Sequence, residues 1–404
     1  MSGIVIYKFG GSSLSDPDRV MRVAEKIKKI KDSGEKILVV VSAQGNTTDE
    51  LIKTARSYYP VPAPRELDAL LSCGENISAA ILSAVLGGIS VKSVSLSAFQ
   101  LGLLTDSNFG NAHIKTIENT ESVRQLLNEG VTPVITGFQG IDRNRNITTL
   151  GRGGSDTTAV AIAHALDARE CVLCTDVLGV YTADPRIVPK ARLLREISYE
   201  EMYELSAAGA KVINFRALDL AKNHGIRIYR RSTFEEGEGT LISKGSEMED
   251  NRIKGITYSK QEAKISVLGL DQKSNSSLKI LSEIEKSGIN IEFLMDNITY
   301  DGLENLVFLV KRDKIVSAVK VLETLADLYE KIIWDVEVGT VSIVGSGLRE
   351  KSGVIFRIMS LLSERKIPIY MVSTSEIKVT IVVNAADVEK VVLLLHEGFG
   401  LENF

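Results

Sequence analysis

The segment GIVIYKFGGSSLSDPDRVMRVAEKIKKI, residues 3–30, joins a short apolar run to a glycine-rich loop and an amphipathic repeat. The apolar run at residues 3–8 predicts a β-strand. Ser15 is expected to cap the helix that follows, and Pro17 suits the first turn of that helix. Its buried side should be the apolar stripe Val20, Val23, Ala24, Ile27 and Ile30. The segment therefore predicts a strand, a loop and a helix in that order.

The same alternation continues along the N-terminal part of the chain. Residues 36–43 (KILVVVSA) are a continuous apolar run, and a helix is expected from about Asp49. Further helices are predicted at 72–87 and after the loop TTLGRGGSDTT, where Ser155 or Asp156 would be the cap. Further strands are predicted at VKSVSLS, VTPVITGF, ECVLCTD and RIYRRST. Fully apolar strands that alternate with helices indicate an α/β fold with a mainly parallel sheet between helices.

The C-terminal part contains an internal repeat. The stretch from KISVLGL to KIVSAVKVLETLAD and the stretch from TVSIVGS to ADVEKVVLLLHEGF follow the same order of strands and helices. The pattern predicts two small β-α-β-β-α-β modules. We expect a first domain at 1–240, a linker at 241–260, and modules at 261–338 and 339–404, an arrangement compatible with strand exchange between the modules.

Composition restricts the class of protein. The 404 residues are 44% hydrophobic and 25% charged, which is typical of a globular chain with more than one domain. A net charge of −4 argues against a nucleic-acid binder. We expect no apolar run near the roughly 20 residues of a membrane span and no signal peptide, so a cytoplasmic location is predicted.

Three cysteines are too few for a disulfide framework. Cys171 and Cys174 have the CxxC spacing, but residues three apart on a strand face opposite sides. They are therefore predicted to be buried thiols rather than metal ligands. The four histidines show no ligand spacing, His164 is expected in the core, and no protein metal site is predicted.

Two glycine-rich loops are the candidate site. Lys8, Gly10, Gly11 and Ser12 form the first, whose backbone N–H groups and lysine could hold phosphate oxygens. Neither a Walker A motif nor G-x-G-x-x-G is present, and a plain tight turn is the alternative. The second loop, at 148–158, adds Arg152 and Asp156. Loops at the ends of strands in one sheet would meet over one crevice, whereas two unrelated surface turns would not.

A set of segments in this order resembles the aspartate kinase family, and the tandem repeat resembles that family's paired ACT modules. The segments are KFGGSS (8–13), VSAQGNTTDEL (41–51), Gly74–Glu75, TGFQG (136–140), TTLGRGGSDTTA (148–159), TDVLGVYTADPR (175–186) and GAKV (209–212). The resemblance covers essentially the whole chain. It implies an amino-acid-kinase fold followed by two ferredoxin-like ACT modules.

The resemblance implies ATP-dependent phosphorylation of the side-chain carboxylate of L-aspartate to 4-phospho-L-aspartate, the first step toward lysine, threonine and methionine. ATP would carry Mg²⁺ with it. A carboxylate acceptor is already ionised at neutral pH, so no general base is needed. The barrier is repulsion between two anions, roughly 4 kcal/mol for unit charges about 4 Å apart at an effective dielectric of about 20. The site must therefore supply cations and N–H groups.

The resemblance also implies residue roles. Lys8 would contact the transferring phosphoryl group and Asp156 would orient it, although simple helix capping is the alternative for Asp156. Arg152 would grip the substrate carboxylate, and Glu75 would accept the substrate's amino group unless it is only a solvated helix charge. Thr48, Phe138 and Ser155 would line the aspartate pocket. The nucleotide would contact Lys8, Gly10, Gly11, Ser12, Thr175, Asp176, Tyr181, Asp184, Arg186, Lys211 and Val212, although plain packing is the alternative for Tyr181.

In the ACT modules the sequence departs from the family pattern. The loop at 270–280 lacks the usual Pro-Gly, Pro368 replaces a common asparagine, and Asp296 stands where glutamine is common. The family's usual effectors are lysine and threonine, and we predict weakened or altered inhibition by them. ACT pairing suggests a homodimer or higher oligomer, and Met248 is a candidate start for a shorter regulatory subunit. The chain ends with the second repeat, which predicts a monofunctional kinase.

Two alternative functions are retained. One is another amino-acid kinase of the same fold, acting for instance on acetylglutamate, glutamate or a nucleotide monophosphate. The other is a catalytically silent amino-acid sensor, which the presence of Lys8, Asp156, Arg152 and Lys211 disfavours.

Overall fold

The computed structural model describes residues 3–210, 212–245, 253–271, 275–298, 303–346, 348 and 353–403. The chain folds into two compact units. The first consists of Met1–Tyr181, Leu193–Ala207 and Lys211–Glu249, and the second of Thr182–Arg192, Ala208–Ala210 and Asp250–Phe404. Two short stretches from the middle of the chain therefore belong to the second unit. Lys211 and Met248 lie outside the described residues.

An eight-stranded sheet in the order β10-β12-β11-β9-β1-β2-β6-β3 is the centre of the first unit. Its strands pair in parallel except for β11 with β12, so the predicted mainly parallel sheet is confirmed. The strands are β1 (Ile4–Phe9), β2 (Lys36–Val41), β3 (Ser93–Leu96), β6 (Thr132–Thr136), β9 (Glu170–Thr175), β10 (Glu196–Ser198), β11 (Ile228–Ser232) and β12 (Thr240–Ser243). A smaller sheet, β5-β4-β7-β8, consists of β4 (Leu103–Thr105), β5 (Ile114–Ile117), β7 (Gln139–Ile141) and β8 (Ile147–Thr149).

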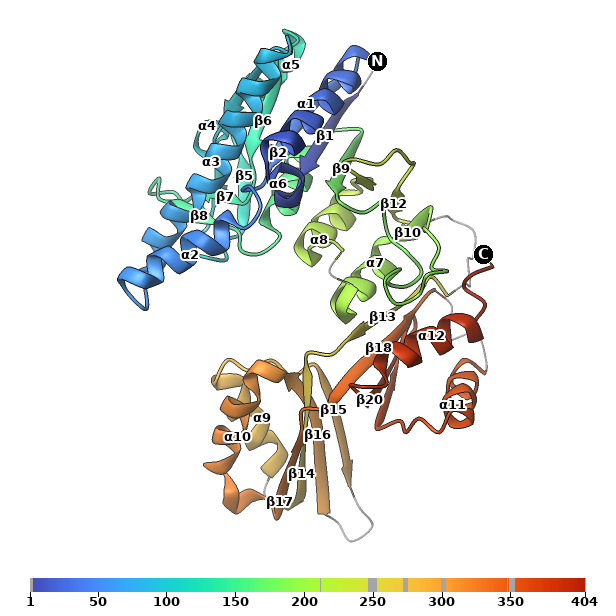
Figure 1. Ribbon diagram of the computed structural model, residues 1–404. Coiled ribbons are helices and arrows are strands. Elements are labelled where there is room, and N and C mark those ends of the chain that lie inside the picture. The colour runs from blue at the N-terminus through green and yellow to red at the C-terminus, as the bar shows by residue number, and fades with distance from the viewer. Residues whose placement is uncertain are drawn as a thin grey trace. The chain divides into compact units, whose positions relative to one another are not determined.

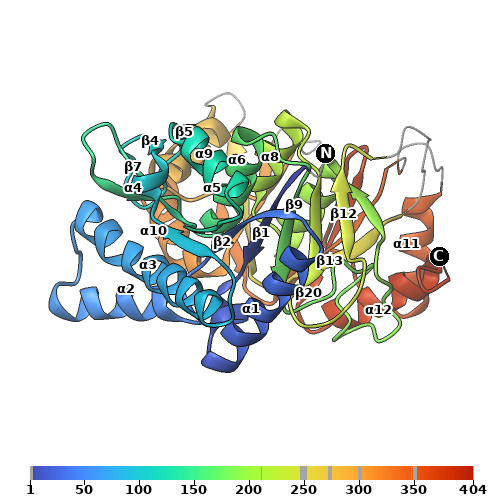
Figure 2. The ribbon, with the colours of Figure 1, turned by 90° about the horizontal axis from the view of Figure 1, so that it is seen from above.

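Helices cover both faces of the large sheet. The helices are α1 (Pro17–Asp32), α2 (Thr47–Tyr58), α3 (Pro64–Gly88), α4 (Ala98–Leu101), α5 (Thr120–Asn128), α6 (Gly154–Ala165), α7 (Tyr199–Leu205) and α8 (Phe215–His224). Figure 2 shows α1 and α3 on one side of β1 and β9, with α6 and α8 on the other. Val5, Tyr7 and Phe9 of β1 pack with α1 and α3 in one buried cluster. The intervening residues Ile6 and Lys8 therefore face α6.

Both predicted helix caps were wrong by one to three residues along the chain. Asp16, rather than Ser15, caps α1, because its carboxylate accepts a hydrogen bond of 3.0 Å from the amide of Arg19. Gly153 precedes α6 in a left-handed conformation, so Ser155 and Asp156 lie inside the first turn. This displacement releases the side chain of Asp156 from capping.

Helix α3 is longer than the predicted helix at 72–87 and begins at Pro64. Contrary to expectation, it is long and apolar enough to cross a membrane by length and composition alone. In the structure Ala79, Leu82 and Leu86 pack it against the large sheet. Its apolar surface is therefore the surface of a core helix.

The thiols of Cys171 and Cys174 are buried in β9, as predicted, and only Cys174 belongs to the cluster beneath α1 and α3. Burial raises the pKa of both thiols, that of Cys174 to about 11, so they are not reactive. The prediction for His164 was wrong. It is exposed on α6, where its ring stacks on that of His224 at 3.6 Å between centroids.

The second unit contains two four-stranded sheets, β15-β16-β14-β17 and β13-β18-β20-β19. The first follows the predicted order, with α9 and α10 on one of its faces (Figure 1). Among the described residues, the second module supplies three strands of its own, β18, β19 and β20; the fourth strand of its sheet is β13, which precedes the first module in the chain and pairs with β18. The elements are β13 (Gly255–Ser259), β14 (Glu262–Asp271), α9 (Ser276–Lys286), β15 (Phe293–Ile298), β16 (Leu303–Lys311), α10 (Ile315–Glu323), β17 (Lys331–Asp335), β18 (Val338–Val344), α11 (Val354–Glu364), β19 (Met371–Thr374), β20 (Lys378–Asn384) and α12 (Val388–Gly398).

Candidate active site

Lys8 and Asp156 form a buried ion pair at the carboxyl edge of the large sheet. Lys8 is the penultimate residue of β1, between β2 and β9, and Asp156 lies in the first turn of α6. Lys8 Nζ lies 2.6 Å from Asp156 Oδ1, and both side chains are 11% exposed. Asp156 thus holds the lysine at the place where the two glycine-rich loops meet, as their positions at the ends of strands predicted.

The loop after β1 needs glycine at position 11. A Cβ there would lie 2.6 Å from the carbonyl oxygen of Ala43, because the segment after β2 crosses close to this loop. The Gly45 amide donates to the Gly11 carbonyl oxygen at 3.0 Å. Among the described residues, the amides of Gly11 and Ser12 have no hydrogen-bond acceptor, which leaves them available to an anion. Ser13 ties the loop to the residue after β11 through a 2.7 Å contact with the Thr233 hydroxyl.

Glu75 is buried and only half satisfied. Gly74 allows α3 to approach Ala43, since a Cβ at position 74 would lie 2.8 Å from the Ala43 methyl group. The amide of Ala43 then donates to Glu75 Oε1 at 2.9 Å, whereas the buried Oε2 has no partner among the described residues. Burial raises the pKa of this carboxyl group from 4.5 to about 7. Glu75 is therefore not the solvated helix charge that sequence patterns alone would favour.

Phe138 connects the loop after β6 to α6. Its φ of 67° is left-handed, a conformation that is strained in a bulky residue. The backbone is held there because the Phe138 amide donates to the Thr158 hydroxyl at 3.1 Å and the Leu150 amide donates to the Phe138 carbonyl at 2.8 Å. Ser155 is buried against Gly137 of the same loop. Strain maintained by several hydrogen bonds is typical of a functional loop.

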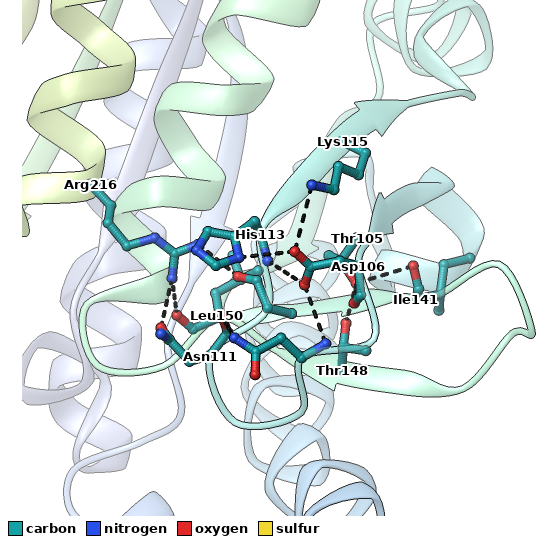
Figure 3. Close-up of polar contacts among 11 residues, drawn as sticks. Thr105, Asp106, Asn111, His113, Lys115, Ile141, Thr148, Leu150 and Arg216 are labelled. Carbon is teal, nitrogen blue, oxygen red and sulfur yellow. Dashed lines mark hydrogen bonds and ion pairs between the residues drawn. The ribbon is translucent and has the colours of Figure 1, made fainter. Parts of the chain in front are cut away.

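The loop that contains Arg152 is held by the start of α8. Asn214 donates to the Arg152 carbonyl oxygen at 2.6 Å, and Arg216 donates to that of Leu150 at 2.6 Å. Arg216 also donates to the carbonyl oxygen of Ala112 and to Asn111 (Figure 3). The side chain of Arg152 itself is 93% exposed, 3.7 Å from Asp49. The backbone of the loop is thus ordered, while its guanidinium group remains in solvent.

A hairpin of the small sheet supports the same loop. Figure 3 shows Asp106 between the ring of His113 and the ammonium of Lys115, at 2.9 and 3.6 Å. Partial burial would raise the pKa of Asp106, but hydrogen bonds from the backbone and ring of His113 outweigh it and lower that pKa to about 2. On α3, buried Asp68 accepts hydrogen bonds from Thr149 and from the Gly110 amide. These contacts fix Thr149, just before the Arg152 loop, and Gly110, in the segment between β4 and β5.

The remaining predicted residues are distributed over both units. In the first unit Thr48 and Val212 are half-buried, the Thr175 hydroxyl accepts from the Val177 amide, Asp176 is exposed, and Tyr181 is half-buried. In the second unit Arg186 pairs with Asp184 at 2.7 Å, and the Tyr258 hydroxyl donates to Asp184 at 3.4 Å. Lys211 falls outside the described residues.

Sequence reasoning missed several residues of this region. Asp68, Asn214 and Arg216 support the loops, and their signal was only their proximity in the chain to the recognised motifs. Arg230 is a buried cation on β11. The pattern of RIYRRST predicts an ordinary strand, although a charged residue at an inward position of a buried strand is itself a signal.

Comparison with known proteins identifies the class. The family model described as the amino acid kinase family matches residues 3–229, and a model described as an ACT domain matches residues 341–399. The fold and the site therefore define an amino acid kinase that is followed by ACT modules.

Relatives that match over the full length of the chain identify a narrower family. The aspartokinase of Mycolicibacterium smegmatis is 40% identical over 98% of this chain and 96% of that protein. The aspartokinase of Pseudomonas aeruginosa is 41% identical over 99% and 98%, respectively. The chain thus belongs to the aspartokinase family.

The crystal structures of Escherichia coli aspartokinase III show the same fold. The complex with aspartate and ADP matches with a TM-score of 0.79 at 23% identity, over 98% of this chain and 99% of that chain. The complex with lysine and aspartate matches with a TM-score of 0.77, at the same identity and over the same shares of the two chains.

Proposed function

We propose that this chain transfers the γ-phosphoryl group of ATP to the side-chain carboxylate of L-aspartate. Membership of the aspartokinase family supports the substrate. The observation that carries the proposal is the buried Lys8–Asp156 pair, with the half-satisfied carboxylate of Glu75 on α3. The other amino-acid kinases and a silent sensor are not favoured by these relatives.

Lys8 is proposed to stabilise the transferring phosphoryl group. An anionic acceptor approaching an anionic phosphate needs fixed positive charge, which is strongest where water is excluded. Asp156 pairs with Lys8 at 2.6 Å and so limits the reorganisation that transfer requires. The amides of Gly11 and Ser12 supply donors for the phosphate oxygens. No general base is needed because the aspartate side chain is already ionised.

Glu75 is proposed to recognise the α-amino group of the substrate. Its Oε2 is buried and has no partner among the described residues, which suits a bound ammonium group. An ammonium group beside the carboxylate would lower its pKa from about 7 and restore the charge. Phe138, Ser155, Thr48 and Arg152 are proposed to complete the aspartate pocket, with Arg152 turning inward from solvent to bind a carboxylate.

ATP is the proposed phosphoryl donor, with Mg²⁺ carried on its phosphates. The backbone cradle at Gly11 and Ser12 would hold the terminal phosphates beside Gly10, whose own amide donates to the Cys174 carbonyl oxygen at 3.4 Å. Thr175, Asp176 and Tyr181 would contact the ribose and base. Mg²⁺ would add positive charge to the phosphate oxygens when bound. Asp184, Arg186, Lys211 and Val212 remain proposed nucleotide residues.

A hydroxamate assay tests the proposal. Purified protein, ATP, Mg²⁺ and L-aspartate are incubated with hydroxylamine, which traps an acyl phosphate but not a phosphate ester. We expect aspartyl hydroxamate from L-aspartate and none from L-glutamate, acetylglutamate or a nucleotide monophosphate. ADP release with one of those acceptors, and none with aspartate, would assign the chain to another amino-acid kinase.

An amino-acid effector is proposed to bind the first ACT module. This module contains a cavity of about 410 Å³ lined by Asn275, Ser277, Asp296, Ile298 and Glu304. Burial first, and then a hydrogen bond with Glu304, raise the pKa of Asp296. Two carboxyl groups in one cavity suit an ammonium group. Because the sequence departs from the family pattern in these modules, assays with lysine and threonine, alone and together, should show weak or altered inhibition. Asp296→Asn should reduce that inhibition further, since it removes one of the two carboxyl groups of the cavity. Ordinary submillimolar inhibition by the pair would contradict the prediction.

A homodimer or higher oligomer and a cytoplasmic location complete the proposal. Exposed apolar side chains of the second unit, including Leu294, Ile333 and Trp334, are candidates for a contact between copies. Light scattering over a concentration series measures the oligomeric state, and a monomer at all concentrations would refute the contact.

A further inference from the structure

Arg230 lies in the same row of the sheet as Lys8. The strand register pairs Lys8 of β1 with Leu173 of β9, and Leu173 with Arg230 of β11. All three strands are parallel, so residues in one row point to the same face of the sheet. That face is the one covered by α6, which contains Asp156. Two strand spacings separate the backbones of Lys8 and Arg230, about 10 Å.

Arg230 is a buried residue whose Nε has no direct partner in the part of the chain that the structure describes. The residue is 8% exposed, and its Nε has no hydrogen bond among the described residues. In the described part of the chain, no carboxylate oxygen lies within 4.0 Å of the guanidinium nitrogens of Arg230. Desolvation lowers the pKa of Arg230, while Asp156 and Asp176 act on it as more distant negative charges and raise that pKa. An arginine so placed normally binds a carboxylate or a phosphate.

A purely structural role explains this arrangement less well. Asp156 is already paired with Lys8 at 2.6 Å, and Asp176 is exposed to solvent, where it needs no counter-ion. Neither carboxylate is within hydrogen-bond distance of Arg230. A buried cation whose Nε donor is unused destabilises the fold unless a ligand completes it.

The positions of the proposed nucleotide residues indicate what the ligand is. Asp176 directly follows β9 and is proposed to contact the ribose, whereas Lys8 on β1 is proposed to contact the terminal phosphoryl group. A polyphosphate chain between these two positions would cross the end of β9. Arg230 flanks β9 on the side opposite Lys8, and a guanidinium group suits two phosphate oxygens at once.

We propose that Arg230 binds the phosphate chain of the nucleoside triphosphate, so that the chain is held between Lys8 on β1 and Arg230 on β11. This inference rests on the proposed function, because it assumes that the nucleotide occupies this edge of the sheet. It adds a positioning residue for the phosphates on a strand that none of the recognised motifs includes. Substitution of Arg230 should not change the affinity for ligands that lack a phosphate chain.

Titration calorimetry with Arg230→Gln tests this assignment. The dissociation constants of ADP and of adenosine, the latter measured by displacement, are compared with those of the wild-type protein. We expect the ADP constant to rise at least tenfold and the adenosine constant to change less than twofold. The matched control is Arg231→Gln, because Arg231 is the next residue of β11, points to the other face and donates to the Glu238 carbonyl at 3.0 Å. This control should leave the ratio of the two constants unchanged.

The other outcomes have distinct meanings. Equal weakening of ADP and adenosine, or no change in either, would overturn the assignment and leave Arg230 as a structural cation. If Arg230→Gln does not fold, Arg230→Lys keeps the charge but loses the planar fork. The ratio of ADP to adenosine affinity should then fall at least threefold, and an unchanged ratio would overturn the assignment. A wild-type protein that binds ADP but forms no aspartyl hydroxamate would refute the proposed reaction without affecting this result.

Discussion

Glu75→Gln is expected to remove a pH dependence from the binding of aspartate. The carboxyl group of Glu75 has its pKa raised to about 7 by burial, so it is only half ionised at pH 7 in the free enzyme. Only the ionised form can accept the substrate's ammonium group with full charge. The apparent KM for aspartate should therefore scale with the inverse of the ionised fraction. That fraction falls from about ten-elevenths at pH 8 to about one-eleventh at pH 6, which predicts a rise in KM of about tenfold.

The glutamine variant keeps the shape of the side chain and loses its charge. Its amide oxygen can still accept the hydrogen bond from the Ala43 amide that Glu75 Oε1 now accepts at 2.9 Å. A hydrogen bond to a charged partner contributes about 1.5–3 kcal/mol, so KM at pH 8 should rise by about 10- to 150-fold. Between pH 6 and pH 8 this raised KM should remain flat.

The same substitution should stabilise the fold at high pH. The folded-state pKa of Glu75, about 7, lies above its ordinary value of 4.5, so the folded protein resists ionisation of this group. The destabilisation begins as pH rises through 4.5 and is complete above about 7. It amounts to about 3 kcal/mol, which the neutral glutamine would not incur. Glu75→Gln should unfold at a higher temperature than wild type at pH 8 and show no advantage near pH 4.

Two measurements on one preparation test the role of Glu75 in aspartate binding and its cost to stability. Initial rates of ADP release over a range of aspartate concentrations give KM at pH 6, 7 and 8, and thermal unfolding is followed in the same buffers. Glu66→Gln is the control, because Glu66 is an exposed carboxylate on the same helix, α3. A wild-type KM that does not change between pH 6 and pH 8, or a glutamine variant that keeps the wild-type profile, would refute the reasoning.

Three further predictions concern the rest of the site. Lys8→Met should lower kcat by at least about 100-fold at a temperature where the variant is folded, since it removes a fixed cation from the transferring phosphoryl group. It should also lower the thermal midpoint, because Asp156 is left buried without its partner. The exposed Lys36 gives the control Lys36→Met, and retained turnover in folded Lys8→Met would contradict the assigned role. Gly11→Ala should destabilise the fold by about 1–3 kcal/mol in urea unfolding, because its Cβ would lie 2.6 Å from the Ala43 carbonyl oxygen, and a wild-type midpoint would show that the loop can shift. The pKa of Asp106 is lowered from 3.8 to about 2, so its contribution to stability is present above pH 3.8 and is lost as pH falls through 2. Asp106→Asn should therefore lose less stability in acid than the wild-type protein, as followed by circular dichroism. Acid titrations that are identical for the two proteins would contradict this account.

Local pattern was enough for much of this protein. The alternation of apolar runs and amphipathic repeats predicted the mainly parallel sheet, because each strand buried on both faces must be apolar along its whole length. The internal repeat predicted two similar modules, although not that β13 completes the second one. A strand that pairs across such a distance leaves no local signal, since hydrogen-bonded partners are chosen by packing rather than by neighbours in the chain.

The sequence by itself determined which residue types gather at the strand ends: glycines, Lys8, Asp156 and the Gly74–Glu75 pair. Only the tertiary structure decided how these residues are ionised and which partners they have. Burial of Glu75 beside Ala43 raises its pKa to about 7, and the displaced start of α6 frees Asp156 to pair with Lys8. Arg230 becomes a candidate site residue only when β9 and β11 align it with Lys8. Charge and desolvation depend on what lies within a few ångströms in space, and that surrounding is assembled from segments far apart in the chain.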